Sequence, residues 1–190
     1  MGARIASARR RGLPQSDAAA YLLRTPSLSV SRMEHRRCDA PSGIWEDDLG
    51  GKSMVTIVKS VKFDAAHVLT NHNGLCKNLH GHTYRVDVSV RQAENDNSDM
   101  VMDFKDVKHI CEELVLSKFD HAFIYDETSA GESEIAAVVV KNGMRTAALP
   151  FRSTAENLAR WIFETLKVRI PCLHSVRVYE TADSCAEYSA

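Results

Sequence analysis

The clearest pattern in the chain is a strict alternation of apolar and polar positions on either side of a short polar loop at 71–74. Before the loop, one parity carries Val55, Ile57, Val61, Phe63, Ala65 and His67. After the loop, a second run carries His80, His82, Tyr84, Val86, Val88 and Val90. A period of two is typical of a strand with one face in the core, so we predict two strands that pair across the loop.

Helical periodicity follows in two places. Asp103 is predicted to cap a helix that ends near Phe119. The apolar stripe of this helix is formed by Phe104, Val107, Cys111 and Leu114. A capping box from Ser153 to Glu156 predicts a second helix, whose inward residues are Leu158, Trp161, Ile162 and Leu166. We therefore assign Asp103 and Glu156 to capping rather than to chemistry.

The segment between these helices, residues 135–149, contains two apolar runs separated by Asn142-Gly143. That dipeptide favours a two-residue hairpin turn, so we predict a short accessory ribbon. A strand at 176–181 and a short edge strand at 184–189 complete the chain. The predicted order is β-β-α-α-β-β with an inserted hairpin. This is an α+β fold with an antiparallel sheet and two helices on one face.

Composition narrows the class of protein. The chain has 190 residues, 44% of them hydrophobic, which is enough for one domain with its own core. A net charge of -1 gives no general electrostatic attraction to nucleic acid or to an anionic membrane. No apolar run reaches the roughly 20 residues of a membrane span. The five cysteines include no CxxC pair, which favours a reducing compartment, and we expect a cytoplasmic protein.

The first 53 residues differ from the rest and form a basic N-terminal extension. They are rich in arginine and serine and poor in acidic residues, which is the composition of an organelle transit segment. A disordered tail and an upstream start codon are the alternatives, and Met54 is a natural start. We favour a disordered, dispensable tail before a domain at 54–190, with organelle targeting kept as the alternative.

Three histidines give the chain its candidate metal site. His80 and His82 point to the same side of one strand, and His67 has the matching parity on the strand before. Three nitrogen ligands with an open fourth position are typical of a catalytic zinc. The cupin alternative needs a Glu shortly after the HxH pair, and positions 83–90 contain none. Cys76 lies four residues before the pair, whereas His72 is read as an ordinary polar residue.

Two further places carry candidate chemistry. Asp120 and His121 are adjacent at the end of the first helix, where a carboxylate can orient an imidazole and raise its basicity. Glu180 ends the apolar stripe of the strand at 176–181, where burial without a partner is costly. A ligand with an amidine-like edge would supply that partner.

The motifs FDAAH, CKNLHGHTY, VMDF, FDHAF, STAENLARWIF and VRVYET, in this order, resemble the 6-pyruvoyltetrahydropterin synthase superfamily over about residues 54–189. Three residues separate Cys76 from His80. This short spacing is similar to the 6-carboxytetrahydropterin synthase branch, which serves 7-deazaguanine and queuosine biosynthesis. The resemblance implies conversion of 7,8-dihydroneopterin triphosphate to 6-carboxy-5,6,7,8-tetrahydropterin, with release of acetaldehyde and triphosphate.

The resemblance also implies roles for individual residues. The metal ligands would be His67, His80 and His82, holding Zn2+. Cys76 would be the general base, and Asp120 and His121 would complete its relay. Substrate contacts would come from Glu180, which would bind the 2-aminopyrimidinone edge of a pterin, and from Ser153 and Thr154.

The resemblance further implies the tunnelling fold and a homo-oligomer, a trimer or hexamer with sites at subunit interfaces. Asp120 and His121 would then come from a neighbouring chain. Three alternatives stay open: a 6-pyruvoyl or folate-route relative, a thiol hydrolase that uses Cys76, His121 and Asp120, and a non-catalytic zinc or pterin-binding protein.

Overall fold

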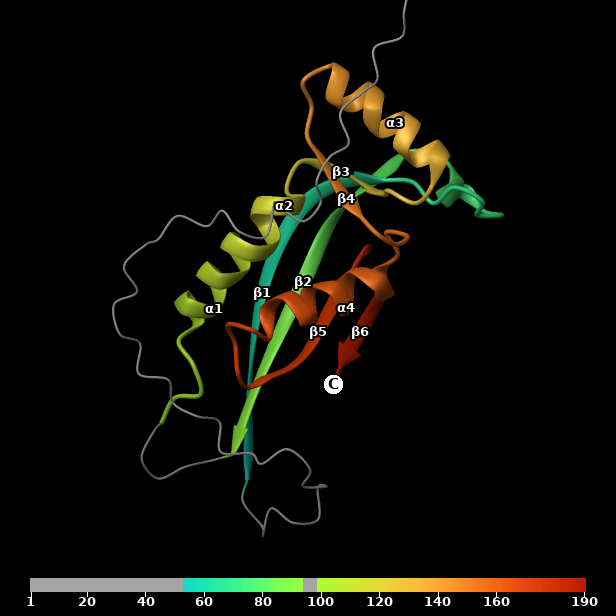
Figure 1. Ribbon diagram of the computed structural model, residues 1–190. Helices are drawn as coiled ribbons and strands as arrows, with labels where there is room; N and C mark the ends of the chain where they lie inside the picture. The colour runs from blue at the N-terminus through green and yellow to red at the C-terminus, as the bar shows by residue number, and fades with distance from the viewer. Residues whose placement is uncertain (1–52, 94–98) are drawn as a thin grey trace, which may run out of the picture. The chain divides into compact units, whose positions relative to one another are not determined.

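A six-stranded sheet organises the computed structural model, which describes residues 53–93 and 99–190 (Figure 1). The predicted extension at 1–53 lies outside the described residues, apart from its last residue. In chain order the elements are β1 (Met54–His67), a 3-10 turn (Leu75–Lys77), β2 (His80–Ala93), α1 (Phe104–Cys111), a π-helical segment (Glu112–Leu116), α2 (Ser117–Phe119), β3 (Ala122–Asp126), α3 (Ala130–Lys141), β4 (Thr146–Leu149), α4 (Ala155–Leu166), β5 (Leu173–Tyr179) and β6 (Cys185–Ser189).

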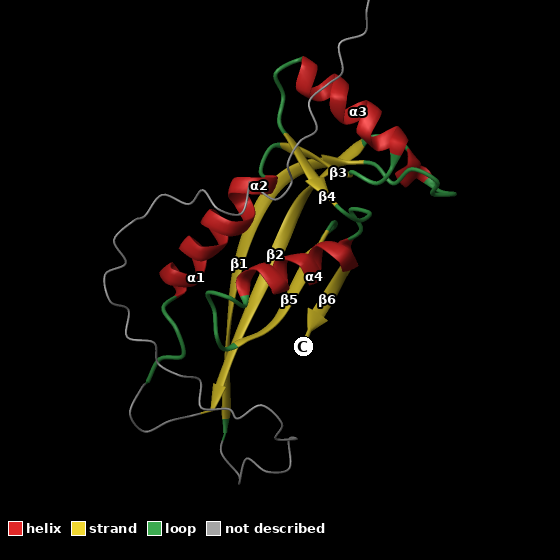
Figure 2. Cartoon of the chain, in the orientation of Figure 1, coloured by secondary structure: helices red, strands yellow, loops and turns green. Residues whose placement is uncertain are grey.

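The long hairpin of β1 and β2 is the centre of the sheet, whose strand order is β4-β3-β1-β2-β5-β6 (Figure 2). The two strands are antiparallel and paired from Met54↔Ala93 to His67↔His80. Their side chains alternate between buried and more exposed positions, and Phe63, Tyr84 and Val88 lie in the core. The two predicted strands are therefore confirmed, as is the edge strand near the C-terminus.

The prediction of a wholly antiparallel sheet is wrong, because β3 and β4 add parallel pairs. β3 pairs parallel to β1, with Ala65 opposite Ala122, and β4 pairs parallel to β3. β3, which has five residues, four of them buried, was not among the predicted strands. A strand buried on both faces carries no alternation for a pattern search to find. The α+β class itself is confirmed, with a mixed sheet.

The predicted hairpin at 135–149 is also wrong. Residues up to Lys141 belong to α3, which is capped by Ser129, whose hydroxyl accepts from the Glu132 main-chain N–H. Gly143 has φ 74°, the left-handed conformation in which helices commonly end. The Asn142-Gly143 dipeptide therefore ends a helix, and the strand after it, β4, pairs with β3 instead of folding back.

Two helical segments cover the core face of the central strands, as predicted. The first is the unbroken run of α1, the π-helical segment and α2, and the second is α4. Their residues pack with the inward residues of β1, β2 and β5 in one cluster that includes Phe119 and Leu158. Asp103 caps α1, accepting from the Lys105 N–H at 2.7 Å. Phe104 departs from its predicted stripe and is 50% exposed.

The capping box before α4 is displaced by one residue. The cap is Thr154, whose hydroxyl accepts from the Asn157 N–H, and Glu156 is exposed. Ser153, the predicted cap, is buried. The displacement frees the Ser153 hydroxyl and carbonyl for another contact.

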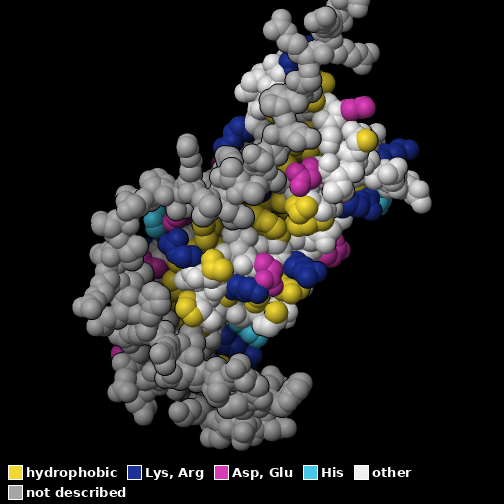
Figure 3. All heavy atoms as spheres, in the orientation of Figure 1, with side chains coloured by type: hydrophobic (Ala, Val, Ile, Leu, Met, Phe, Trp, Pro, Cys, Tyr) yellow, Lys and Arg dark blue, Asp and Glu magenta, His cyan; other side chains and the backbone are white. Residues whose placement is uncertain are grey.

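A third helix, α3, lies on the other face of the sheet. It packs through Ala136 on Phe123, and Phe123 alternates along β3 with the core residues Ala122 and Ile124. Figure 1 shows α3 beside the end of β1 and the start of β2. Among the described residues, no helix is both long and apolar enough to cross a membrane. The described side chains visible in Figure 3 mix both signs of charge with apolar groups.

Candidate active site

Three histidines meet where β1 ends and β2 begins. His67 is opposite His80 in the ladder, and His82 is opposite Ala65, so all three rings project from the same side of the hairpin. The ring centroids lie 4.5 Å apart for His67–His80, 5.1 Å for His67–His82 and 5.0 Å for His80–His82. One nitrogen of each ring lies within 4.8 Å of the others. The predicted cluster therefore exists within a single chain.

Two of the three rings are held through Nδ1 by main-chain carbonyls. His67 Nδ1 lies 3.0 Å from the Ser153 carbonyl, and His80 Nδ1 lies 2.8 Å from the Asn78 carbonyl. A carbonyl oxygen only accepts, so Nδ1 carries the proton in both rings, and their Nε2 atoms present lone pairs. Burial and then the charge of His80 lower the pKa of His82, and the main chain of Glu180 opposes this shift.

The Nε2 atoms of the three rings could together hold a cation. The Nε2 atoms of His67 and His80 are 3.0 Å apart, and His82 Nε2 is buried without a partner among the described residues. Burial, followed by the charges of His80 and His82, lowers the pKa of His67 to about 4, although the bond to Ser153 opposes this shift. The ring is thus neutral at pH 7. Three imidazole nitrogens suit zinc and several other divalent metals, and they leave a position open for a ligand.

Gly81 allows the two ligands of β2 to sit this close to β1. A Cβ at position 81 would lie 2.9 Å from the carbonyl oxygen of Ala65, which is too close for any real side chain. The sequence analysis did not single out this glycine. A glycine between two candidate ligands was the available signal, since glycine often marks a close approach of two backbones.

Cys76 and Glu180 lie near the histidines. Cys76 is a half-buried free thiol in the 3-10 turn, and its carbonyl accepts from the Leu69 N–H at 2.9 Å. Tyr84 is buried beneath the cluster. Its pKa is raised by burial first, and then by the charges of Glu180 and Cys76.

Glu180 follows β5 at the same end of the sheet. Its pKa is raised by partial burial and by the charge of Glu156, while His80 lowers it. A half-buried carboxylate beside a second carboxylate gains from a ligand that donates two N–H groups. The predicted place of Glu180 at the site is consistent with this environment.

Ser153 and Thr154, the predicted substrate contacts, are occupied by the protein itself. Ser153 holds His67 through its carbonyl and, at 3.3 Å, through its hydroxyl. Thr154 caps α4. Both therefore support the ligand His67 and the helix behind it in this chain.

Asp120 and His121 form the predicted pair, but away from the histidines. His121 Nδ1 lies 3.0 Å from Asp120 Oδ1, and the two side chains are 74% and 42% exposed. The pair is attached to Asp64, whose N–H donates to Asp120 and whose carbonyl accepts from the His121 N–H. Asp64 precedes His67 by three residues, about 10 Å along a strand. Within the described residues, the hydrogen bonds of this pair reach neither the histidines nor Cys76.

The backbone of His121 is held in an uncommon conformation. Its φ is 57°, a left-handed value that a residue with a side chain adopts at a cost. A hydrogen bond of 2.7 Å from its N–H to the Asp64 carbonyl keeps it there. The imidazole is thereby exposed to solvent just before β3 begins beside β1.

Known proteins share these features. A curated 6-carboxy-5,6,7,8-tetrahydropterin synthase from Haemophilus influenzae is 43% identical over 139 residues, covering 71% of this chain and 99% of that protein. One of the same name from Synechocystis is 34% identical and covers 71% of this chain and 93% of that protein. The structure of Caenorhabditis elegans 6-pyruvoyl tetrahydropterin synthase is similar with a TM-score of 0.54 and 27% identity, over 73% of this chain and 97% of that one.

These likenesses confirm the expected tunnelling fold and the expectation of a lyase-type enzyme. The model of the family described as 6-pyruvoyl tetrahydropterin synthase matches residues 56–190, most of the chain and all of the site. The chain therefore belongs to the 6-pyruvoyl tetrahydropterin synthase family.

Proposed function

We propose that this protein is a zinc-dependent 6-carboxy-5,6,7,8-tetrahydropterin synthase. It would convert 7,8-dihydroneopterin triphosphate to the 6-carboxy product, with release of acetaldehyde and triphosphate, in 7-deazaguanine and queuosine biosynthesis. The observation that carries the proposal is the convergence of three imidazoles, with the half-buried thiol of Cys76 in the loop that joins their two strands. The relative from Haemophilus influenzae bears the same activity in its name and is matched over nearly its full length.

The residues of the chain divide the work. His67, His80 and His82 would hold the metal, which supplies acidification of a substrate hydroxyl and stabilisation of the negative charge that forms on it. Cys76 would take and return protons at the substrate side chain as general base. Glu180 would accept two N–H groups from the pterin and so orient the ring.

Asp120 and His121 would act on a neighbouring copy. Their separation from the histidines of their own chain supports this arrangement, and their exposure leaves them free to meet another subunit. Since oligomers are usually symmetric, one such contact repeats around a closed ring. We therefore propose a homo-oligomer, a trimer or a hexamer, with active sites between subunits.

Product analysis tests the proposed function. The metal-loaded protein is incubated with 7,8-dihydroneopterin triphosphate, acetaldehyde is assayed, and the pterin product is identified by mass. Acetaldehyde together with a 6-carboxy product is the expected result, with both lost after chelation and in Cys76→Ala. A 6-pyruvoyl product without acetaldehyde would move the protein to the other branch of its family. Metal binding without turnover would make it a binding protein.

A further inference from the structure

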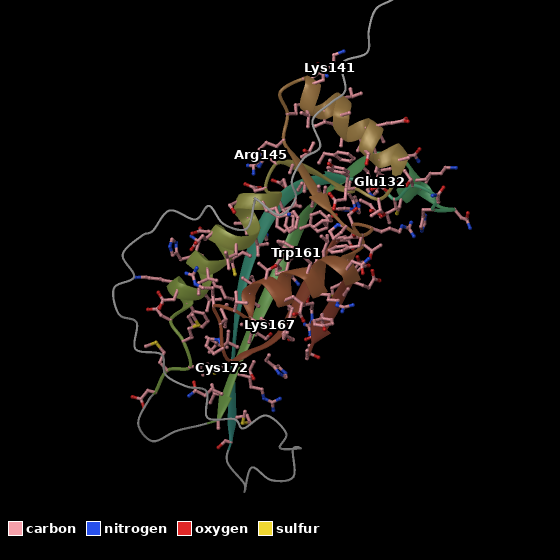
Figure 4. All side chains as sticks on the ribbon, in the orientation of Figure 1. Glu132, Lys141, Arg145, Trp161, Lys167 and Cys172 are labelled. Carbon is pink, nitrogen blue, oxygen red and sulfur yellow. The ribbon has the colours of Figure 1, made fainter. Side chains whose placement is uncertain are left out.

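A buried carboxylate outside the proposed chemistry joins three parts of the molecule. Glu132, in the first turn of α3, is 0% exposed. Its Oε1 accepts from the main-chain N–H of Thr70 at 3.2 Å and from the Thr70 hydroxyl at 2.9 Å, and its Oε2 accepts from the Asp126 N–H at 2.8 Å. Figure 4 labels Glu132 where α3 begins. All three donors are neutral groups, so the charge is stabilised by hydrogen bonds and by the helix N-terminus.

Thr70 is held through each of its polar groups. Besides the two bonds to Glu132, its hydroxyl lies 2.9 Å from the hydroxyl of Ser129, and its carbonyl accepts from Arg152 at 3.4 Å. Both partners belong to other elements: Ser129 caps α3, and Arg152 precedes α4. The hydrogen bonds of Thr70 therefore hold the loop after β1 against α3 and against the segment before α4.

That loop carries Cys76 and has little packing of its own. Residues 71–79 are exposed except for Cys76, which is half-buried. Hydrogen bonds therefore hold it in place. One of them runs from the N–H of Leu69, the residue before Thr70, to the carbonyl of Cys76 at 2.9 Å. Fixing Thr70 thus fixes its neighbour Leu69, whose N–H holds the main chain of Cys76.

We propose that Glu132 is a positioning residue that sets the place of the Cys76 thiol relative to the three histidines. It acts through Thr70 and the Leu69–Cys76 hydrogen bond. The inference rests on the proposed function only in taking Cys76 as the base. Reacting groups must lie within a narrow range of positions, and a displacement of about 1 Å costs about 100-fold in rate.

The test begins with Glu132→Gln, which keeps the volume but replaces one acceptor oxygen with a donor. In either orientation an NH2 group then faces the N–H of Asp126 or the two donors of Thr70. We expect kcat to fall about 10-fold or more because the thiol is displaced, with KM and metal affinity changed less than about 3-fold. Alkylation of Cys76 by iodoacetamide, followed by peptide mass, should change in rate by about 3-fold or more, since reactivity depends on access.

Two sets of controls separate positioning from stability. Asp103→Ala removes a helix cap at the far end of β1, so it should lower the melting temperature and leave kcat and Cys76 alkylation unchanged. Thr70→Ser keeps both donors and should behave as the unchanged protein. Thr70→Val keeps the shape but loses the hydroxyl. It should reproduce the effects of Glu132→Gln, and the double variant should be less than additive.

The outcomes are distinct. If Glu132→Gln only lowers the melting temperature, with kcat and Cys76 alkylation as in Asp103→Ala, Glu132 has a structural role alone and the proposal is overturned. If Glu132→Gln does not fold, kcat and the rate of Cys76 alkylation are measured in Thr70→Val instead. If the unchanged protein shows no turnover, the proposed function fails, while the alkylation rates still decide whether Glu132 positions the thiol.

Discussion

Two regions of the molecule differ in whether one chain brings their reacting groups together. The first is the metal end of the β1–β2 hairpin, which carries His67, His80 and His82, and the second is the Asp120–His121 pair. At the metal end, three candidate ligands converge, carbonyls orient the rings of His67 and His80, and His67 is only 1% exposed. The pair is bonded to Asp64 and otherwise open to solvent. The metal end is pre-organised by the fold of one chain. His121 is exposed and held in a strained backbone conformation, and its hydrogen bonds within the described residues reach neither the histidines nor Cys76.

The contrast supports the proposal that a second copy completes the site. The three histidines converge within one chain, so the site should bind metal in an isolated chain. In the proposed oligomer, His121 reaches that site from another subunit. Metal binding and turnover should therefore respond differently to substitutions in the two regions.

The largest effect is expected at His67. His67→Ala removes a ligand, so the loss of metal affinity should exceed the roughly 10–100-fold that loss of a supporting group costs, and turnover should vanish. Metal competition titration measures it. His109→Ala, on the exposed side of α1, is the matched control and should bind metal normally. Unchanged affinity in His67→Ala would remove the histidines from the metal site.

His121→Ala should separate the two regions. A proton-transfer group contributes about 10²–10⁴-fold, so kcat should fall by this factor. Metal affinity should stay the same, because no hydrogen bond links His121 to the three histidines within the described residues. A parallel loss of metal affinity would contradict the separation.

Gly81→Ala should damage the metal end through the backbone. The new Cβ would meet the Ala65 carbonyl at 2.9 Å, forcing β2 away from β1 between two ligands. Overpacking of this kind costs about 1–3 kcal/mol of folding stability. Metal affinity should fall as well. Gly131→Ala, where the nearest atom is 3.7 Å away in a helix, should be neutral or stabilising, by up to about 1 kcal/mol.

The smallest effect concerns thiol chemistry. Burial raises the pKa of Cys111 to about 12, so at pH 8 only about one molecule in 10⁴ carries the thiolate. Cys111 should therefore resist iodoacetamide at pH 8, whereas the half-buried Cys76 should react. Peptide mass analysis after timed alkylation decides between them. Rapid labelling of Cys111 would mean that the core opens easily.

The sequence alone predicted the metal end well and the sheet beyond it poorly. The β1–β2 hairpin is half buried, so its alternation was visible, and the three histidines stood on one parity. β3 is buried on both faces and shows no period. Asn142-Gly143 suits both a hairpin turn and a helix end, and only the cap at Ser129 decides between them. The place of Asp120–His121 depends on a parallel pairing with β1 that no local pattern indicates.

The hydrogen bonds that hold the site residues in place were the least predictable feature of the molecule. The carbonyls of Ser153 and Asn78 orient the rings of His67 and His80, and a carbonyl is present in every residue. Glu132 meets Thr70 across 62 positions of the chain. Contacts of this kind follow from the finished topology.

Subunit mixing tests the central claim that two copies complete each site. Cys76→Ala and His121→Ala chains, each inactive alone, are co-expressed with different tags, and the mixed oligomer is purified and loaded with metal. If the pair comes from a neighbour, half of the sites have an intact Cys76. Half of these sites face a neighbour with an intact His121, so about one quarter of all sites are complete. The account predicts turnover near that fraction of the unchanged protein. Mixed oligomers as inactive as their parents would place Cys76 and His121 of each site in the same chain and contradict it.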